Sequence, residues 1–231
     1  MSGTRSQHTT LDEYQRAVEK LSAARELAQS THEDAQSRGD AAATAQNLAD
    51  LSTALADFKK VREGLSPVDL LRVESNAEIV GDHHIAFVLP RGVSKLELLE
   101  RAQEVYQETS SDHLIQPDTL VIWAKNPAFQ ETYDTPQRIE VIGCVPDSPG
   151  LSKEPQEALL AQQGCRFANP AEASLGFALY LIFTKESFFD GRAARTSGET
   201  IGQANIGLMK VYDSDRGFDY YGAAGVKINK P

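Results

Sequence analysis

Cysteine is scarce in this chain, which has only Cys144 and Cys165 among its 231 residues. The first residues are polar, and they lack the basic segment followed by an apolar segment that marks a secretory signal. We therefore expect the chain to stay in the cytoplasm, where thiols are kept reduced. Cys144 lies in an apolar run and is expected to be a small buried hydrophobic residue, so the sequence predicts neither a disulfide nor a reactive thiol.

Positive charge is also in short supply. The chain has 23 Lys and Arg against 33 Asp and Glu, a formal charge of −10 that is spread along its length. Proteins that bind nucleic acid need a basic face for the phosphates. The one tight cationic group, Lys59, Lys60 and Arg62, is balanced by Asp57 and Glu63. The composition therefore argues against a nucleic-acid partner.

The glycine-rich signatures of several large enzyme classes are missing. The chain contains no GxxxxGK[ST], no strand-linked GxGxxG and no GxSxG, so it lacks the loops of phosphate-binding, dinucleotide-binding and common serine-hydrolase sites. Pairs of carboxylates in loops are expected by chance in an acidic chain and predict no glycosidase. Whether the protein is an enzyme stays open, and the balance is against catalysis.

The five histidines show no spacing that is typical of a metal site. His83 and His84 are adjacent and would point to opposite faces of a strand, and no HxH, HExxH or CxxC occurs. We expect His83 in a solvated loop, His84 at a strand edge and His113 in a loop. The alternating carboxylates of residues 213–219 could form a calcium loop, but their β-type flanks favour a hairpin turn. We predict no metal and no cofactor.

The strongest single element is a helix that begins at Asn169. Asn169 is a good N-cap, Pro170 suits the first helical position, and Glu172 can close a capping box. Residues 173–183 are apolar almost all round, so this helix needs cover on several sides. The apolar run has roughly half of the about 20 residues that a membrane span requires. We therefore expect a central helix in a globular body and no membrane span.

Residues 11–65 carry two apolar stripes at steps of three and four residues, after a polar segment, residues 1–10, that we expect to be disordered. Gly39 is a natural C-cap and Asp40 a natural N-cap, so the pattern favours an antiparallel helical hairpin of the coiled-coil type. The alternative is one helix running through Gly39, at a cost of about 1 kcal/mol relative to alanine. The stripe residues that we expect to form an interface are Leu11, Val18, Leu21, Leu48, Leu55 and Phe58.

Residues 66–231 combine predicted helices with about five or six predicted strands, which indicates a mixed α+β domain. Helices are expected after Ser94 and over residues 154–164. A terminal β-hairpin should pair residues 208–212 with 218–221. The remaining predicted strands are residues 84–89, 120–124, 138–145 and 226–228.

Two hypotheses of function follow from these patterns. The stripe and the missing catalytic signatures favour a non-catalytic interaction or assembly protein, whose hairpin binds a protein partner or a second copy while the α+β domain is a binding platform. The alternative is a small-ligand-binding protein or enzyme with a pocket under residues 190–207, a segment that otherwise reads as a mobile connecting loop. The residues predicted to grip an anionic ligand there are Arg192, Arg195, Ser197, Thr200, Gln203 and Asn205.

Overall fold

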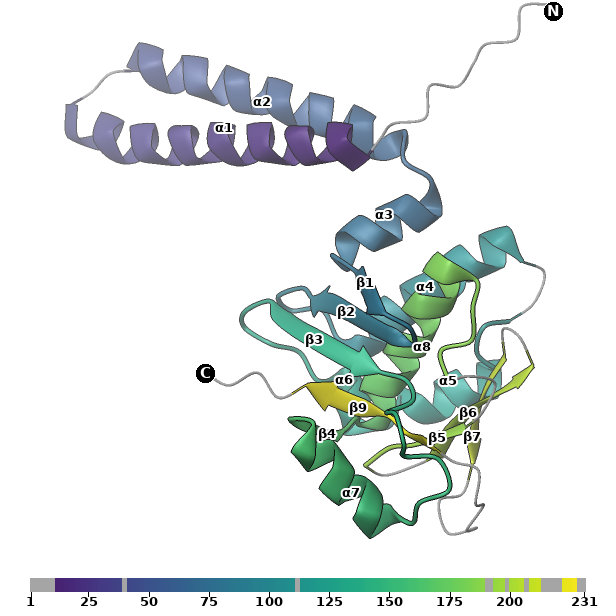
Figure 1. The fold of residues 1–231 in the computed structure, drawn as a ribbon. Coiled ribbons are helices and arrows are strands. Elements are labelled where there is room, and N and C mark those ends of the chain that lie inside the picture. The colour runs from purple at the N-terminus through teal and green to yellow at the C-terminus, as the bar shows by residue number, and fades with distance from the viewer. Residues whose placement is uncertain are drawn as a thin grey trace, which may run out of the picture. The chain divides into compact units, whose positions relative to one another are not determined.

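The computed structural model describes residues 11–38, 41–110, 113–189, 193–197, 200–205, 208–212 and 222–227. These residues form a mixed α+β fold (Figure 1), which confirms the predicted class. The chain divides into two compact units, Met1–Leu70 and Leu71–Pro231, and each is described by itself. The domain boundary expected near residue 65 stays a prediction. No helix in the described part of the chain is long and apolar enough to cross a membrane.

The first unit is built on the predicted helical hairpin. Helices α1 (Leu11–Arg38) and α2 (Ala41–Glu63) run side by side in opposite directions (Figure 1), so one continuous helix is wrong. The rings of Tyr14 and Phe58 lie 5.4 Å apart between their centroids. Ala17 and Ala54 are buried in the seam, where small side chains let two helices approach closely.

Helix α3 (Pro67–Glu74) follows the hairpin and starts after Ser66. The Ser66 hydroxyl accepts a hydrogen bond from the backbone N–H of Asp69 at 3.1 Å and donates one to the Asp69 carboxylate at 2.6 Å. This pairing satisfies an N–H group that the first helical turn would otherwise leave unpaired.

The second unit contains an antiparallel five-stranded sheet in the order β1-β2-β3-β9-β4. The predicted short last strand is confirmed, and it lies inside this sheet, between β3 and β4, rather than at an edge. Residues 225–227 therefore connect β3 to β4 within the sheet. The strands are β1 (Glu78–Gly81), β2 (His84–Leu89), β3 (Gln137–Ile142), β4 (Cys165–Phe167) and β9 (Gly225–Lys227).

Helix α8 (Pro170–Thr184) is the predicted central helix, and every residue from Pro170 to Ile182 is buried. Its capping box is present as expected, because Asn169 and Glu172 bond to each other's backbone N–H groups. The helix packs against α4 (Lys95–Thr109), α6 (Pro127–Gln130), β2 and β3. Helix α4 starts after Ser94 as predicted, with a capping box between Ser94 and Glu97, and α7 (Lys153–Gln162) corresponds to the helix expected over residues 154–164.

The strand predicted at residues 120–124 is wrong. Residues 120–123 belong to helix α5 (Pro117–Trp123), which places Pro117 at its first turn, and Ala124 is its C-cap. Trp123 is buried and stacks on Phe129 with ring centroids 4.7 Å apart, while Val121 and Ile122 are 59% and 65% exposed. A short apolar run does not distinguish a strand from a helix, and the proline start signal was the better guide.

The prediction that residues 190–207 form a connecting loop is also wrong for the residues of this segment that the structure describes. A second sheet, in the order β7-β6-β5-β8, includes two strands from this segment. Strand β7 was expected to begin a terminal hairpin, but it pairs with β6. The partner expected for it, residues 218–221, lies outside the described residues. The strands, which bring the described total to nine, are β5 (Ala193–Arg195), β6 (Thr200–Asn205), β7 (Leu208–Tyr212) and β8 (Gly222–Ala223).

Candidate functional site

One side of the helical hairpin carries exposed apolar side chains. Val18 and Leu55 directly follow the buried seam residues Ala17 and Ala54, and Leu48 lies two turns before Leu55 on the same helix face. Their exposed fractions are 36% for Val18, 57% for Leu48 and 43% for Leu55. Because the helices are antiparallel, positions that follow the seam by one residue fall on the same side of both helices. We call the surface of Val18, Leu48 and Leu55 the Val18 side.

The opposite side of the hairpin is charged. Lys20 and Asp57 each follow a buried seam alanine by three residues, and their side chains form an ion pair at 2.6 Å. The ion pair lowers the pKa of Asp57, first through the hydrogen bond from Lys20 and then through its charge. Leu27, 52% exposed, lies two turns after Lys20 on this side. The exposed large apolar side chains of the hairpin therefore divide unequally, with Val18, Leu48 and Leu55 on one side and Leu27 on the other.

The six predicted interface residues divide between these surfaces. Val18, Leu48 and Leu55 lie on the exposed Val18 side, while Leu21 and Phe58 are half-buried at the seam. The side chain of Leu11 lies outside the described residues. The sequence stripe thus contains both the contact between α1 and α2 and an additional surface.

The six predicted ligand-binding residues are not seen to converge. Arg192 lies outside the described residues, and only the backbone of Thr200, Gln203 and Asn205 is described, on strand β6. The Arg195 guanidinium donates a hydrogen bond to Gln156 Oε1 at 2.7 Å, so it is engaged in a contact with helix α7. Ser197 is exposed and is the member of the set that lines a cavity described below.

His83 and His84 occupy different surroundings from those expected. His83 lies in a turn, as expected, with φ 55°, but it is half-buried and its ring Nδ1 lies 2.8 Å from the carbonyl oxygen of Ser187. His84 is half-buried on β2, which pairs on both sides, and it contacts Glu140 at 2.9 Å. His84 is therefore in the sheet interior rather than at an edge.

A buried lysine is the polar group that sequence reasoning missed. The side chain of Lys95 is fully buried at the start of α4, and its Nζ donates to Glu131 at 2.5 Å and to the Tyr133 hydroxyl at 3.1 Å. Burial opposes the charge of Lys95, but these two hydrogen bonds outweigh it and raise the lysine pKa. The bond from Lys95 lowers the pKa of Glu131. Both groups are therefore charged at neutral pH, and neither is set up as a base.

Arg166 on β4 forms a second strong ion pair. Its Nη1 and Nη2 atoms donate to the two carboxylate oxygens of Glu172 at 2.8 and 2.6 Å, and Nη1 also donates to the carbonyl oxygen of Phe167 at 2.8 Å. The bonds to Glu172 raise the pKa of Arg166. The Glu172 side chain is only 5% exposed, whereas that of Arg166 is 49% exposed. The guanidinium thus has one face in the protein and one toward water.

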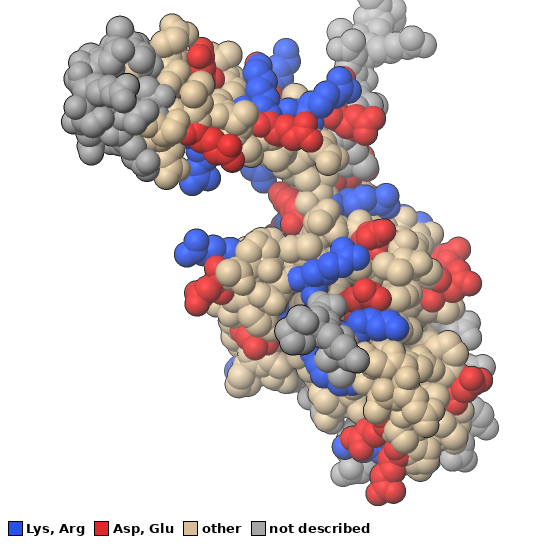
Figure 2. All heavy atoms as spheres, turned by 60° about the vertical axis from the view of Figure 1, so that its left-hand side comes forward, with Lys and Arg blue, Asp and Glu red and all other residues tan. Residues whose placement is uncertain are grey.

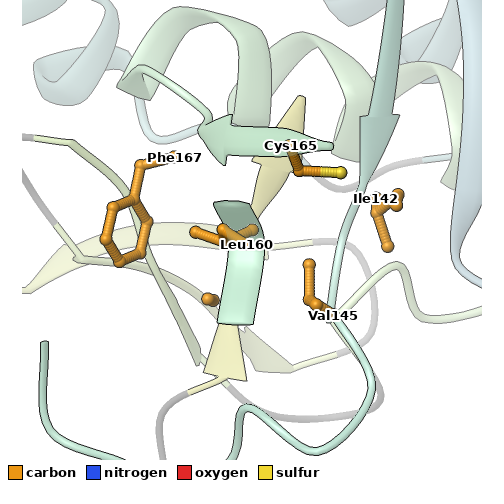
Figure 3. Close-up of a cluster of buried hydrophobic side chains, with 6 residues drawn as sticks. Ile142, Val145, Leu160, Cys165 and Phe167 are labelled. Carbon is orange, nitrogen blue, oxygen red and sulfur yellow. The ribbon is translucent and has the colours of Figure 1, made fainter. Parts of the chain in front are cut away.

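A cavity of about 490 Å³ lies along β4 and α7. Part of its lining belongs to a buried apolar cluster, and Figure 3 shows Cys165 and Phe167 of β4, Leu160 of α7, and Ile142 and Val145 of that cluster. Burial raises the pKa of the Cys165 thiol, so this sulfur is a weak nucleophile. The lining residues are Glu157, Leu160, Ala161, Cys165, Arg166, Phe167 and Ser197.

The cysteines and the residue types that bind metal ions complete the set that the sequence singled out. Cys144 is half-buried rather than fully buried as expected, because it follows the end of β3, and no disulfide joins Cys144 and Cys165. The described residues hold no cluster of three His, Cys, Asp or Glu side chains that fits a metal ion. Figure 2 shows cations and carboxylates interspersed on the visible face. No protein-family model, curated protein or solved structure matches this chain.

Proposed function

We propose that this protein is a non-catalytic assembly protein and that its helical hairpin binds a second copy of the chain. The observation that carries the proposal is the exposure of Val18, Leu48 and Leu55 on one side of the hairpin. Two helices alone bury little apolar surface, because a stable core needs several covered faces. In residues 12–30 and 44–65, the buried apolar side chains are Ala17, Ala54 and Leu65.

The spacing of the apolar residues fits a four-helix bundle formed by two hairpins. Leu21 and Phe58 at the seam and Val18, Leu48 and Leu55 beside it repeat at steps of three and four residues. A second hairpin laid on the Val18 side would bury these three side chains and complete a bundle core. At about 25 cal/mol per Å², this burial would be the main favourable term in association.

Charge favours a second copy over an unrelated partner. Tyr14 lies level with Phe58, so Arg62 and Glu63 are near the base of the hairpin, while Arg25 and Glu26 lie about three turns toward its tip. A two-fold axis at the level of Val18 would place the base of one hairpin next to Arg25 and Glu26 of the other copy. Arg25 of each copy would then meet Glu63 of the other, as an isologous interface requires.

The first test replaces Leu48 or Leu55 by Asp in the full chain. We expect the unmodified chain to sediment as two copies at tens of micromolar and either variant to sediment as one, because a carboxylate cannot be buried in the bundle core without a large penalty. Analytical ultracentrifugation measures the mass. Leu27→Asp is the matched control, since Leu27 is similarly exposed but lies on the opposite side of the hairpin, two turns from Lys20, and it should leave the dimer intact.

Circular dichroism checks whether each variant keeps its helices. A monomeric unmodified chain, or a Leu27→Asp variant that dissociates as readily as Leu48→Asp, would contradict the proposal. Charge reversal gives a second check. Arg25→Glu should weaken the dimer by about 0.5–1 kcal/mol, and adding Glu63→Arg should restore it if the two residues meet across the two-fold axis.

A further inference from the structure

The cavity along β4 has hydrogen-bond donors at its wall. Strand β4 is the last strand of its sheet, and no strand of the described chain pairs with its outer edge. The backbone N–H of Ala168 bonds to Ala224 of the neighbouring segment at 2.9 Å. Because backbone groups alternate along an antiparallel strand, the N–H groups of Cys165 and Phe167 point to the outer edge. They have no partner among the described residues.

The Arg166 side chain reaches the same outer edge. Its Nη1 donates a hydrogen bond to the carbonyl oxygen of the next residue, Phe167, and this carbonyl points to the outer edge. The guanidinium has five N–H groups. Three of them are occupied by Glu172 and Phe167, through Nη1 twice and Nη2 once. The Nε–H and the second Nη2–H have no partner in the described part of the chain, and these two form the side-on fork that matches a carboxylate.

The rest of the cavity lining is mostly apolar and includes one hydroxyl, from Ser197, and one carboxylate, from Glu157. Leu160, Ala161 and Phe167 form apolar wall, and the exposed Ser197 lies near the end of β4, where its N–H bonds to the Ala168 carbonyl at 2.9 Å. A volume of about 490 Å³ lies within the range of small-molecule sites. The carboxylates of Glu157, in the cavity wall, and Glu172 would repel a ligand with two negative charges, so they disfavour its binding.

We propose that this cavity binds a small monocarboxylate with an apolar body. The carboxylate bonds to the free fork of Arg166, Ser197 adds a hydroxyl, and the apolar body packs against Leu160 and Ala161. Glu172 holds the guanidinium in place and is a positioning residue. The site shares only Ser197 with the set predicted from sequence, and it is independent of the assembly proposed for the hairpin.

The test titrates 3-phenylpropionate into the isotope-labelled full chain and follows backbone amide signals by NMR. We expect saturable shifts at the amides of Phe167 and Ser197. Acetate has the carboxylate without the apolar body and should bind at least about tenfold more weakly. 3-Phenylpropylamine has the same body with the opposite charge and should not shift these signals, while phenyl phosphate should bind more weakly than the carboxylate.

Arg166→Gln should weaken 3-phenylpropionate binding by about tenfold or more, because one charged, bidentate contact is lost. Arg138→Gln is the matched control: Arg138 also lies on a strand of this sheet, also pairs with a glutamate, and has a side chain that is 46% exposed against 49%. It should leave binding unchanged. Ala161→Phe fills the cavity without touching the ion pair and should abolish binding even if Arg166→Gln fails to fold.

Several results would overturn the proposal. They are the absence of saturable shifts at millimolar 3-phenylpropionate, equal binding of the amine, equal weakening by Arg138→Gln and Arg166→Gln, and unchanged binding in Ala161→Phe. Shifts confined to residues 12–63 would likewise show that the carboxylate binds elsewhere. None of these results bears on the mass of the unmodified chain, so the assembly proposal stands or falls separately.

Discussion

At the scale of single residues, Lys95 shows how a polar side chain is held in a protein interior. A lysine ammonium is costly to bury unless it is paired and hydrogen-bonded. Glu131 and Tyr133 supply both partners, and the ammonium also lies 5.0 Å from the centre of the Tyr133 ring. The cluster therefore ties the segment after α6 to the start of α4.

The two members of this ion pair should respond differently to substitution. Glu131→Gln leaves a buried ammonium with weaker partners and should cost about 1–3 kcal/mol of unfolding free energy, a range reduced because the Glu131 side chain is 48% exposed. Lys95→Met removes the buried charge and lets Glu131 turn to water, so it should stay within about 1 kcal/mol of the unmodified chain. Chemical denaturation measures both, and a larger loss for Lys95→Met would contradict this account.

The pH dependence of this pair follows from its shifted pKa values. The pKa of Glu131 is lowered in the folded chain, so its contribution is present above the unfolded value of about 4.3 and is lost as the pH falls through the folded pKa. The pKa of Lys95 is raised, so its contribution is present below about 10.4 and is lost as the pH rises further. The stability difference between the unmodified chain and Glu131→Gln should therefore shrink below about pH 4.

Gly143 is a residue whose lack of a side chain matters. An added Cβ would overlap the carbonyl oxygen of Phe188 and lie 2.8 Å from its ring, so backbone would have to move. Gly143→Ala should destabilise the chain by more than about 2 kcal/mol. Gly81→Ala is the control, because its nearest atom would be 4.0 Å away, and it should change stability by less than about 1 kcal/mol. Thermal and chemical denaturation of both variants test the difference.

At the scale of elements, helix α8 organises the second unit. It is buried from Pro170 to Ile182, and Phe177 stacks on Phe189 with ring centroids 5.5 Å apart. The fully buried part of the helix ends before Phe183, which is half-buried. The guanidinium carbon of Arg72 lies 4.8 Å from the centre of the Phe183 ring. The helix is therefore a core element whose last turn approaches the surface.

Alanine substitutions along α8 should reflect this difference in burial. Leu179→Ala and Phe177→Ala should each cost about 2–5 kcal/mol of unfolding free energy, because both side chains are fully buried and leave cavities. Phe183→Ala should cost less than about 2 kcal/mol, since part of its ring is already in water and Arg72 gains hydration. Denaturant titration compares the three, and equal losses would contradict the half-buried position of Phe183.

At the scale of the whole chain, contacts between distant segments complete both sheets. Strand β9 enters the five-stranded sheet between β3 and β4, and β8 pairs with β5 of the second sheet. Ala223 and Val226 are buried in these positions. The last described residues thus join the two sheets of the second unit, and the unit depends on segments that are far apart in sequence.

The sequence alone determined the elements whose signals are local. The Ser94 and Asn169 capping boxes, the apolar run of α8 and the stripes of residues 11–65 depend on neighbours within a few residues, so spacing was enough to predict them. Only the tertiary structure decided what depends on distant partners: that residues 200–205 pair as a strand, and that Glu131 meets Lys95. The candidate carboxylate site belongs to this second kind. Its donors come from the open edge of β4 and its wall from α7, and backbone groups that face a cavity leave no pattern in the sequence.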